Sequence, residues 1–387
     1  MKLPILSALL ALSLAATPAK AADWWPEATA AALNSAGKNA AELTRALKEV
    51  PAAQREGMQF LIDNMPPVDL TTLKANFLLQ HVAAAYEAMA AAPWAASVPK
   101  DIFLNDVLPY ACLNEARDNG RPKLREIAAP LVKDCKTTGE AAQVLNKKLF
   151  GIVKVKYSTQ RKKPDQSARE SMESGLATCS GLSILLVDAC RAVGVPARIA
   201  GTPMWTNMRG NHTWVEVWDG EWKFAGAAEP DPNGLNCGWF KGDASKADDS
   251  KPAHRIYASS FKKTGLAFPL VWNLGIDWVP AVNVTARYTG AAPKPEEGKV
   301  RVMVRVLDKP QGKRVPAKVT VTDKAYPAVT FSGTSSNETA DLNNILPFNL
   351  TPGHSYLIEV SEGGRTVKSE LTVSKDAEQI TTITLQP

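Results

Sequence analysis

Residues 179–218 read CSGLSILLVDACRAVGVPARIAGTPMWTNMRGNHTWVEVW, and this stretch decides the fold of the chain. Its first part, residues 179–192, predicts a helix that Gly194 closes. Its second part holds two runs of β-branched and aromatic residues, 197–201 and 213–218, which predict strands. The sequence therefore places a cysteine at the start of a helix and, further on, a histidine at the head of a strand.

A third strand follows closely. Residues 222–225 again cluster aromatic and apolar side chains, and Asp219-Gly220 separates them from the preceding strand. Asp-Gly between two strand patterns is a strong signal for a β-hairpin. We therefore expect the histidine-bearing strand to lie inside an antiparallel sheet.

Cys179 and His212 are the candidate catalytic pair. The first backbone N–H groups of a helix lack partners within the helix, and the helix dipole favours negative charge there, so this position suits a thiolate nucleophile. The N–H of Cys179 could also stabilise an oxyanion. His212, one of only four histidines in the chain, is held on a strand and could serve as the base for the thiol.

Three blocks in this order resemble the transglutaminase-like superfamily: Cys179-Ser180, then RAVGVPAR at residues 191–198, then HTWVEV at residues 212–217. The resemblance covers roughly Glu140 to Phe240, and the Arg-Ala-x-Gly-x-Pro-Ala-Arg block is its most specific part. It implies a papain-like α+β core with a Cys-His-acid triad, in which Cys179 matches the nucleophile and His212 the base.

The acid of this triad departs from the family pattern. The family commonly has an Asp four residues after a strand aromatic, and counting from Trp222 that position holds Gly226. The strand ends instead in Gly-Ala-Ala-Glu-Pro-Asp, similar to some secreted bacterial relatives. The resemblance therefore makes Glu229 the first candidate to orient His212 and Asp231 the second. Trp205, in the loop before the histidine, is our candidate for lining the substrate cleft.

Five cysteines cannot all pair within one chain. Cys179 and Cys190 are eleven residues apart in one predicted helix, hence about 16 Å apart at 1.5 Å per residue. A disulfide needs Cα atoms within about 7 Å of each other. One economical arrangement joins Cys112 to Cys135 and Cys190 to Cys237, which leaves Cys179 free; other pairings remain open.

The rest of the chain predicts an α+β protein with four segments. Residues 1–21 read as a cleaved signal peptide, with a basic start, an apolar run and a small-x-small site. Residues 22–138 predict a helical N-terminal domain punctuated by prolines, and residues 139–280 the transglutaminase-like core. Residues 281–387 carry short strands between turns, which predict a β-sandwich, either immunoglobulin-like or like the small β-domains appended to secreted hydrolases, without chemistry of its own.

Composition limits the classes of partner. The net charge of +6 is spread along the chain without a basic block, which argues against nucleic acid. No run is long and apolar enough for a transmembrane helix, so we expect a secreted or periplasmic protein. No cluster of acidic residues indicates a calcium site, and we expect neither a metal nor a cofactor.

The function expected from these residues is acyl transfer through a Cys179 thioester. Hydrolysis of a peptide or amide bond is favoured, because an exported enzyme works in abundant water, and the substrate is a peptide or protein, with cell-surface or wall material as one source. Three alternatives remain: a cross-linking transglutaminase, a papain-like wall hydrolase, and an inactive module that keeps the fold for binding.

Overall fold

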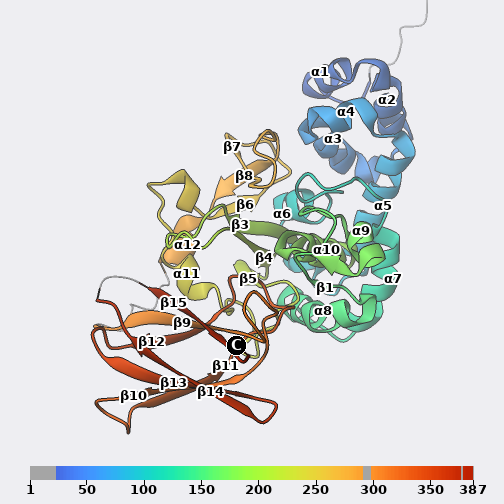
Figure 1. Cartoon of the computed structure of the whole chain (residues 1–387). Helices are drawn as coiled ribbons and strands as arrows, with labels where there is room; N and C mark the ends of the chain where they lie inside the picture. The colour runs from blue at the N-terminus through green and yellow to red at the C-terminus, as the bar shows by residue number, and fades with distance from the viewer. Residues whose placement is uncertain (1–22, 291–297, 376–377, 387) are drawn as a thin grey trace, which may run out of the picture.

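The structure, a computed structural model, describes residues 23–290, 298–375 and 378–386 (Figure 1). A helical N-terminal region leads through a mixed central region to a sheet-rich C-terminal region, which confirms the predicted α+β class. The predicted signal peptide lies outside the described residues. Within those residues, no helix has the length and apolar character needed to cross a membrane.

The N-terminal region is a group of short helices around one apolar core. In order they are α1 (Glu27–Ser35), α2 (Ala40–Glu49), α3 (Arg55–Asn64), α4 (Pro67–Thr72), α5 (Ala75–Ala91) and α6 (Lys100–Asp106). Prolines separate them, because a proline cannot donate the hydrogen bond that a helix interior needs. Pro51 follows α2, Pro67 begins α4 and Pro99 precedes α6, so the predicted breaks are confirmed.

The central region packs helices against both faces of a sheet. Its helices are α7 (Arg121–Val132), α8 (Thr138–Val153), α9 (Ala168–Ser174), α10 (Cys179–Ala192), α11 (Lys241–Ala244) and α12 (Thr285–Thr289). Helix α10 has the bounds that the sequence predicts, and nearly all of its side chains are buried. Side chains of α7 and α8 share its apolar core. This central helix therefore sets the position of Cys179 rigidly.

The central sheet has the strand order β5-β4-β3-β6-β8-β7 and is antiparallel throughout. Its strands are β3 (Ala197–Thr202), β4 (His212–Trp218), β5 (Trp222–Ala225), β6 (Tyr257–Ser259), β7 (Leu266–Ala267) and β8 (Pro280–Asn283), and a short parallel pair, β1 (Lys156–Tyr157) and β2 (Leu176–Ala177), precedes α10. Trp218 faces Trp222 across the β4–β5 hairpin, which confirms the turn predicted at Asp219-Gly220. His212 pairs with Thr202 at the end of the β3–β4 ladder.

The C-terminal region is a β-sandwich. One sheet has the order β11-β10-β13-β14 and the other β12-β9-β15. The strands are β9 (Val300–Leu307), β10 (Lys318–Asp323), β11 (Thr330–Thr334), β12 (Leu346–Leu350), β13 (Ser355–Glu362), β14 (Arg365–Thr372) and β15 (Gln379–Thr384). Alternate side chains of both sheets meet in one apolar core, as the period-two pattern predicts.

The sandwich is held against the central region by charged contacts. Asp243, in α11, is buried and pairs with both Arg209 and Arg301, the second of which lies on β9. Glu378 forms an ion pair with Lys246 and accepts a hydrogen bond from Asn207 at 2.7 Å. An ion pair removed from water is sensitive to the loss of either partner, so these contacts fix how the sandwich meets the central region (Figure 1).

The cysteine pairing considered from the sequence is wrong in this structure. All five cysteines are free. Cys112 lies near Asp188 and Arg191, with Sγ 3.6 Å from an oxygen of the first and 3.8 Å from a nitrogen of the second. Cys190 is fully buried within α10. Both side chains therefore fill positions in the packed interior, and Cys179 is unpaired along with the others.

Candidate functional site

Cys179 is the first residue of α10, and local contacts fix that helix start. Thr178 is the N-cap, and its hydroxyl accepts a hydrogen bond from the N–H of Gly181 at 3.0 Å. The same hydroxyl donates to the carbonyl of Pro164 at 2.5 Å. Capping of this kind stabilises a helix by about 1 kcal/mol. The Cys179 side chain is partly exposed, so it is both held and reachable.

His212 begins β4 and lies within a cage of aromatic rings. It is only 2% exposed. Its ring centroid is 4.7 Å from that of Trp239, 5.0 Å from that of Phe240 and 5.8 Å from that of Trp214. Rings packed on several sides leave the imidazole little freedom to turn. The strand and the cage together fix the direction of its two nitrogens.

The structure brings a third group to this pair, Asp341, which the sequence did not single out. It lies in the segment of residues 335–345 between β11 and β12, called here the 335–345 segment. Asp341 Oδ2 is 3.5 Å from His212 Nδ1. Ligand atoms of Cys179, His212 and Asp341 all lie within 4.8 Å of one another. A thiol, an imidazole and a carboxylate thus meet at one point, drawn from two regions of the fold.

The electrostatics of this point favour a charged imidazole. Burial by itself lowers the pKa of His212, but the Asp341 carboxylate, with Cys179 acting in the same direction, raises it to about 10. Burial likewise raises the pKa of Asp341, and the charge of His212 outweighs it and holds this pKa below its usual value. His212 is therefore an imidazolium at neutral pH, with a carboxylate on one side and the thiol nearby.

Glu229, the acid expected from the sequence, lies beside the site with other partners. Its Oε2 accepts a hydrogen bond from the indole N–H of Trp239 at 2.7 Å. Its carboxylate also accepts one from the backbone N–H of Asp341. Burial, helped by the charge of Asp341, raises the pKa of Glu229. Asp231, the second candidate, is taken up in a local turn, where it accepts hydrogen bonds from Asn233.

Trp205 does not line a cleft in this structure. It is 2% exposed and stacks on Trp214, with centroids 6.1 Å apart and planes within 3°. It also packs behind His212, 6.1 Å from the imidazole. Its role here is to support the histidine from the interior.

The cavity at Cys179 is small. It has a volume of about 20 Å³, enough for one or two water molecules. Its walls come from both regions of the fold and comprise Tyr157, Cys179, Leu182, His212, Thr213, Ala227, Ala228, Glu229, Thr339 and Asp341. The space beside the partly exposed Cys179 is therefore narrow.

The three converging side chains could also take a metal ion. One sulfur, one imidazole nitrogen and one carboxylate oxygen within 4.8 Å of one another match the ligand types that Zn²⁺ accepts. The same set is what a Cys-His-acid mechanism requires. A metal here would occupy the nucleophile and compete with catalysis, so assays of this site need a chelator.

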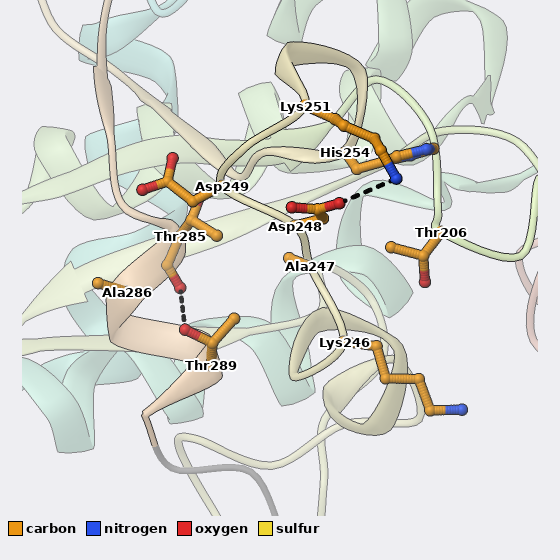
Figure 2. Close-up of a pocket in the computed structure, with 10 residues that line it drawn as sticks. All are labelled: Thr206, Lys246, Ala247, Asp248, Asp249, Lys251, His254, Thr285, Ala286 and Thr289. Atoms are coloured by element: carbon orange, nitrogen blue, oxygen red, sulfur yellow. Dashed lines mark hydrogen bonds and ion pairs between the residues drawn. The ribbon is translucent and has the colours of Figure 1, made fainter.

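A larger hollow lies elsewhere on the central region (Figure 2). Its volume is about 560 Å³, and its charged groups are largely paired. Lys251 meets Asp248 at 3.2 Å, as the dashed line in Figure 2 shows, and Lys246 pairs with Glu378. His254 contacts the carbonyl of Met204 at 3.1 Å. Its ten lining residues include no cysteine, and we assign it no chemistry.

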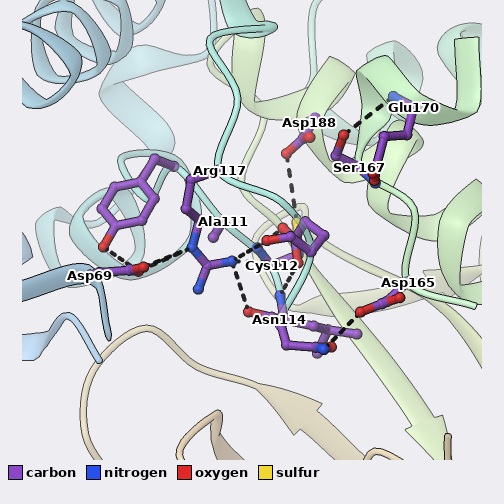
Figure 3. Close-up of polar contacts among 12 residues, drawn as sticks. Asp69, Ala111, Cys112, Asn114, Arg117, Asp165, Ser167, Glu170 and Asp188 are labelled. Carbon is purple, nitrogen blue, oxygen red and sulfur yellow. Dashed lines mark hydrogen bonds and ion pairs between the residues drawn. The ribbon is translucent and has the colours of Figure 1, made fainter. Parts of the chain in front are cut away.

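A second polar cluster joins the N-terminal helices to the central region (Figure 3). Asp69 of α4 pairs with Arg117 at 3.0 Å and accepts a hydrogen bond from Tyr110 at 2.8 Å. Asp188, on the same helix as Cys179, points towards Cys112 in this cluster. Burial, with the charge of Glu115 adding to it, raises the pKa of Asp188 to about 7. Asp188 is thus part of the junction between regions.

This raised pKa makes stability depend on pH. The folded chain holds a proton on Asp188 up to its raised pKa of about 7, whereas the unfolded chain releases it near the ordinary carboxyl pKa of 3.8, so folding becomes less favourable as pH rises across that window. The Asp188→Asn variant has no ionisable group at this position and so removes this loss of folding stability at high pH. We expect its melting temperature, relative to wild type, to be higher at pH 8 than at pH 4.5 by about 2–4 °C or more, measured by circular dichroism. An equal difference at both pH values would contradict this assignment.

One family model matches the central region of the chain. Residues 125–244 match the family model of the transglutaminase-like superfamily. Cys179 and His212 both lie inside this match, whereas Asp341 lies outside it. No curated protein shows a match to the chain.

Solved structures give weaker similarities. A proposed cysteine protease from Cytophaga hutchinsonii shares 20% identity over 33% of this chain and 44% of its own, with a TM-score of 0.27. The red sea bream transglutaminase shares 11% over 76% and 59%, with a TM-score of 0.21. A proposed protease from Parabacteroides distasonis shares 8% over 76% and 54%, with a TM-score of 0.27. The chain spans less than two thirds of each of these structures, and TM-scores this low do not establish a common fold.

Proposed function

Because residues 125–244 carry a transglutaminase-like core, we propose that the protein is a cysteine enzyme that transfers acyl groups through a thioester on Cys179. The observation that carries this proposal is the convergence of Cys179, His212 and a carboxylate within 4.8 Å. A thiol at a helix start beside an imidazolium can ionise and attack a carbonyl carbon. The core supplies the scaffold, and this cluster supplies the chemistry.

The proposed reaction has two halves. The Cys179 thiolate attacks the carbonyl carbon of an amide, and backbone N–H groups at the start of α10 stabilise the oxyanion. The imidazolium of His212 gives its proton to the leaving nitrogen as the C–N bond breaks, which leaves a thioester and a free amine. Neutral His212 then takes a proton from water, whose oxygen attacks the thioester, and the products are a carboxylic acid and the free thiol.

Hydrolysis is the favoured outcome, and a peptide or protein is the substrate class. If a primary amine replaced water in the second half, the same site would form a cross-link. A third arrangement, a site that stays closed and serves only for binding, would give neither product. We further propose that the chain is exported, on the strength of the signal-peptide pattern in residues 1–21, and that it meets its substrate outside the cytoplasm.

Product analysis tests the proposal. The protein is incubated, with EDTA present, with a tryptic digest of known sequence, soluble wall fragments and a fluorescent primary amine, and products are identified by mass spectrometry. We expect new peptide or amide cleavage that a Cys179→Ala variant does not produce. Incorporation of the amine in place of cleavage would identify a cross-linking enzyme. If the two proteins gave the same products on every substrate, the enzyme assignment would be wrong.

A further inference from the structure

We propose that the C-terminal β-sandwich completes the catalytic site: Asp341 is the residue that orients His212, and Glu229 holds the backbone that carries Asp341. This inference rests on the proposed acyl transfer and names a positioning residue for it. Residues 125–244, which match the family model, would then lack one member of the triad when taken alone.

The geometry at His212 assigns one ring nitrogen to each neighbour. Asp341 Oδ2 faces Nδ1 at 3.5 Å, which leaves Nε2 for the thiol of Cys179. In Cys-His-acid sites the acid holds the imidazole in orientation and stabilises its charged form. Asp341 is placed to do both. The separation of 3.5 Å is within ion-pair distance.

The carboxylate of Asp341 is itself fixed. Its Oδ1 accepts a hydrogen bond from the backbone N–H of Asn343 at 2.8 Å, so Oδ2 is the oxygen turned towards the histidine. Arg314 donates to the carbonyls of Asp341 at 2.9 Å and of Asn344 at 3.2 Å, and also to that of Ala340. The 335–345 segment is therefore held in shape by its own domain.

The same segment is tied to the central region beside His212. Asn343 donates its side-chain N–H to the carbonyl of Asn211, the residue before His212, at 3.1 Å. Arg209 donates to the carbonyl of Asn343 at 2.8 Å. Glu229 accepts from the N–H of Asp341. These three contacts between the 335–345 segment and the central region fix the position of Asp341 relative to the imidazole.

Glu229 cannot replace Asp341 without breaking these contacts. Its oxygens already serve Trp239 and the Asp341 backbone, and the only carboxylate at ion-pair distance from His212 among the described residues is that of Asp341. Two carboxylates near one imidazole repel each other, and the raised pKa of Glu229 reflects this as well as burial. Glu229 is thus an anchor for the segment, a role that differs from the one its sequence position suggests.

A pH profile can separate a positioning role from a purely structural one. The ionisable groups that face His212 are Cys179 from α10, Glu229 from the turn after β5 and Asp341 itself, with Tyr157 and Arg314 around Asp341. Of these, Asp341 contributes most to keeping His212 charged. Removing its charge therefore lowers the pKa of the imidazolium, so the charged pair of thiolate and imidazolium becomes less favoured relative to the neutral thiol and imidazole.

The experiment measures alkylation of Cys179 by iodoacetamide from pH 5 to pH 10 in the full-length protein with EDTA, with each labelled cysteine identified by mass spectrometry. We expect Asp341→Asn to slow labelling at pH 6 about tenfold or more, since one unit of pKa is a factor of ten, and to move the inflection to higher pH. Asp341→Glu should restore part of the rate. An NMR titration of His212 should show a pKa lower in Asp341→Asn than in wild type.

The matched control is Asp323→Asn. Asp323 lies in the same sandwich and also pairs with a histidine, with Oδ2 2.7 Å from Nδ1 of His354, so a general effect of removing such a pair would appear here too. We expect its labelling profile to match wild type. Unchanged labelling and an unchanged His212 titration in a folded Asp341→Asn variant would overturn this inference and leave the proposed function standing. Slow labelling of Cys179 in the wild-type protein would overturn both the proposed function and this inference.

Discussion

A Cys179→Ser variant should lose the single fast phase of alkylation that we expect of the folded protein near pH 6. The thiolate is the form of cysteine that is alkylated, and an ordinary thiol is less than about 1% ionised at that pH, whereas the proposed mechanism needs Cys179 as a thiolate. Cys179 should therefore react about a hundredfold faster than an isolated thiol. The measurement is the rate of carbamidomethylation of each cysteine, by mass spectrometry of quenched samples.

The other cysteines sharpen this expectation. Burial raises the pKa of Cys190 to about 12, and it raises those of Cys112 and Cys135 as well, so these thiols should label slowly until the chain unfolds. Cys237 is partly exposed, as Cys179 is, which makes Cys237→Ser the matched control. It should keep the fast phase. A fast phase that survives Cys179→Ser would contradict the assignment of the nucleophile.

The same substitution should abolish turnover. Losing the nucleophile of a covalent mechanism costs roughly four to six orders of magnitude in rate. Because Cys179 is partly exposed and its neighbours remain in place, serine should leave the melting temperature nearly unchanged. A loss of product with intact folding separates chemistry from stability.

Local signals in the sequence were enough to predict the centre of the fold. Helix α10 begins and ends where the pattern places it, and β4 and β5 meet at the predicted Asp219-Gly220 turn. In each case the information lies within a few residues: a closing glycine for the helix and an Asp-Gly turn for the hairpin. Such elements do not depend on how distant segments pack.

The features that sequence reasoning missed all depend on distant packing. Asp341 lies in a polar turn between two strands, and nothing near it in the sequence points to His212; only the meeting of the sandwich with the central region does. The role that we propose for Asp341 would give the C-terminal region a part in the chemistry, which was not expected from the sequence. Trp205 was expected to line a cleft and is buried. The sequence of a loop does not show whether a large ring in it points into the interior or towards solvent.

Replacing His212 by glutamine should lower both activity and stability. Loss of a general acid and base costs about 10²–10⁴-fold in rate. The stability effect comes from Asp341, which is left as a buried carboxylate without its charged partner; breaking a buried pair in this way costs up to about 3–5 kcal/mol. Chemical unfolding of wild type and His212→Gln measures the second effect independently of the first.

The pH dependence of this loss follows from the sign of the His212 shift. Its pKa is about 10 in the folded chain against an ordinary value of 6.5 for histidine, so the stability it contributes is fully present below about pH 6.5 and is lost as pH rises through about 10. His212→Gln should therefore be most destabilised, relative to wild type, at pH 6 and little destabilised above pH 10. A difference that does not change with pH would show that packing of the ring, and not its charge, carries the effect.

The double variant His212→Gln/Asp341→Asn separates the two consequences of losing the histidine. Asparagine at position 341 carries no charge, so no buried charge is left without a partner. Most of the lost stability should therefore return, while activity stays at the level of His212→Gln. Stability changes of contacting residues are not additive, and the size of the departure measures their coupling. If the double variant were instead destabilised by the sum of the two single changes, Asp341 and His212 would not be coupled, and the contact between the sandwich and the catalytic histidine would have to be reassigned to packing alone.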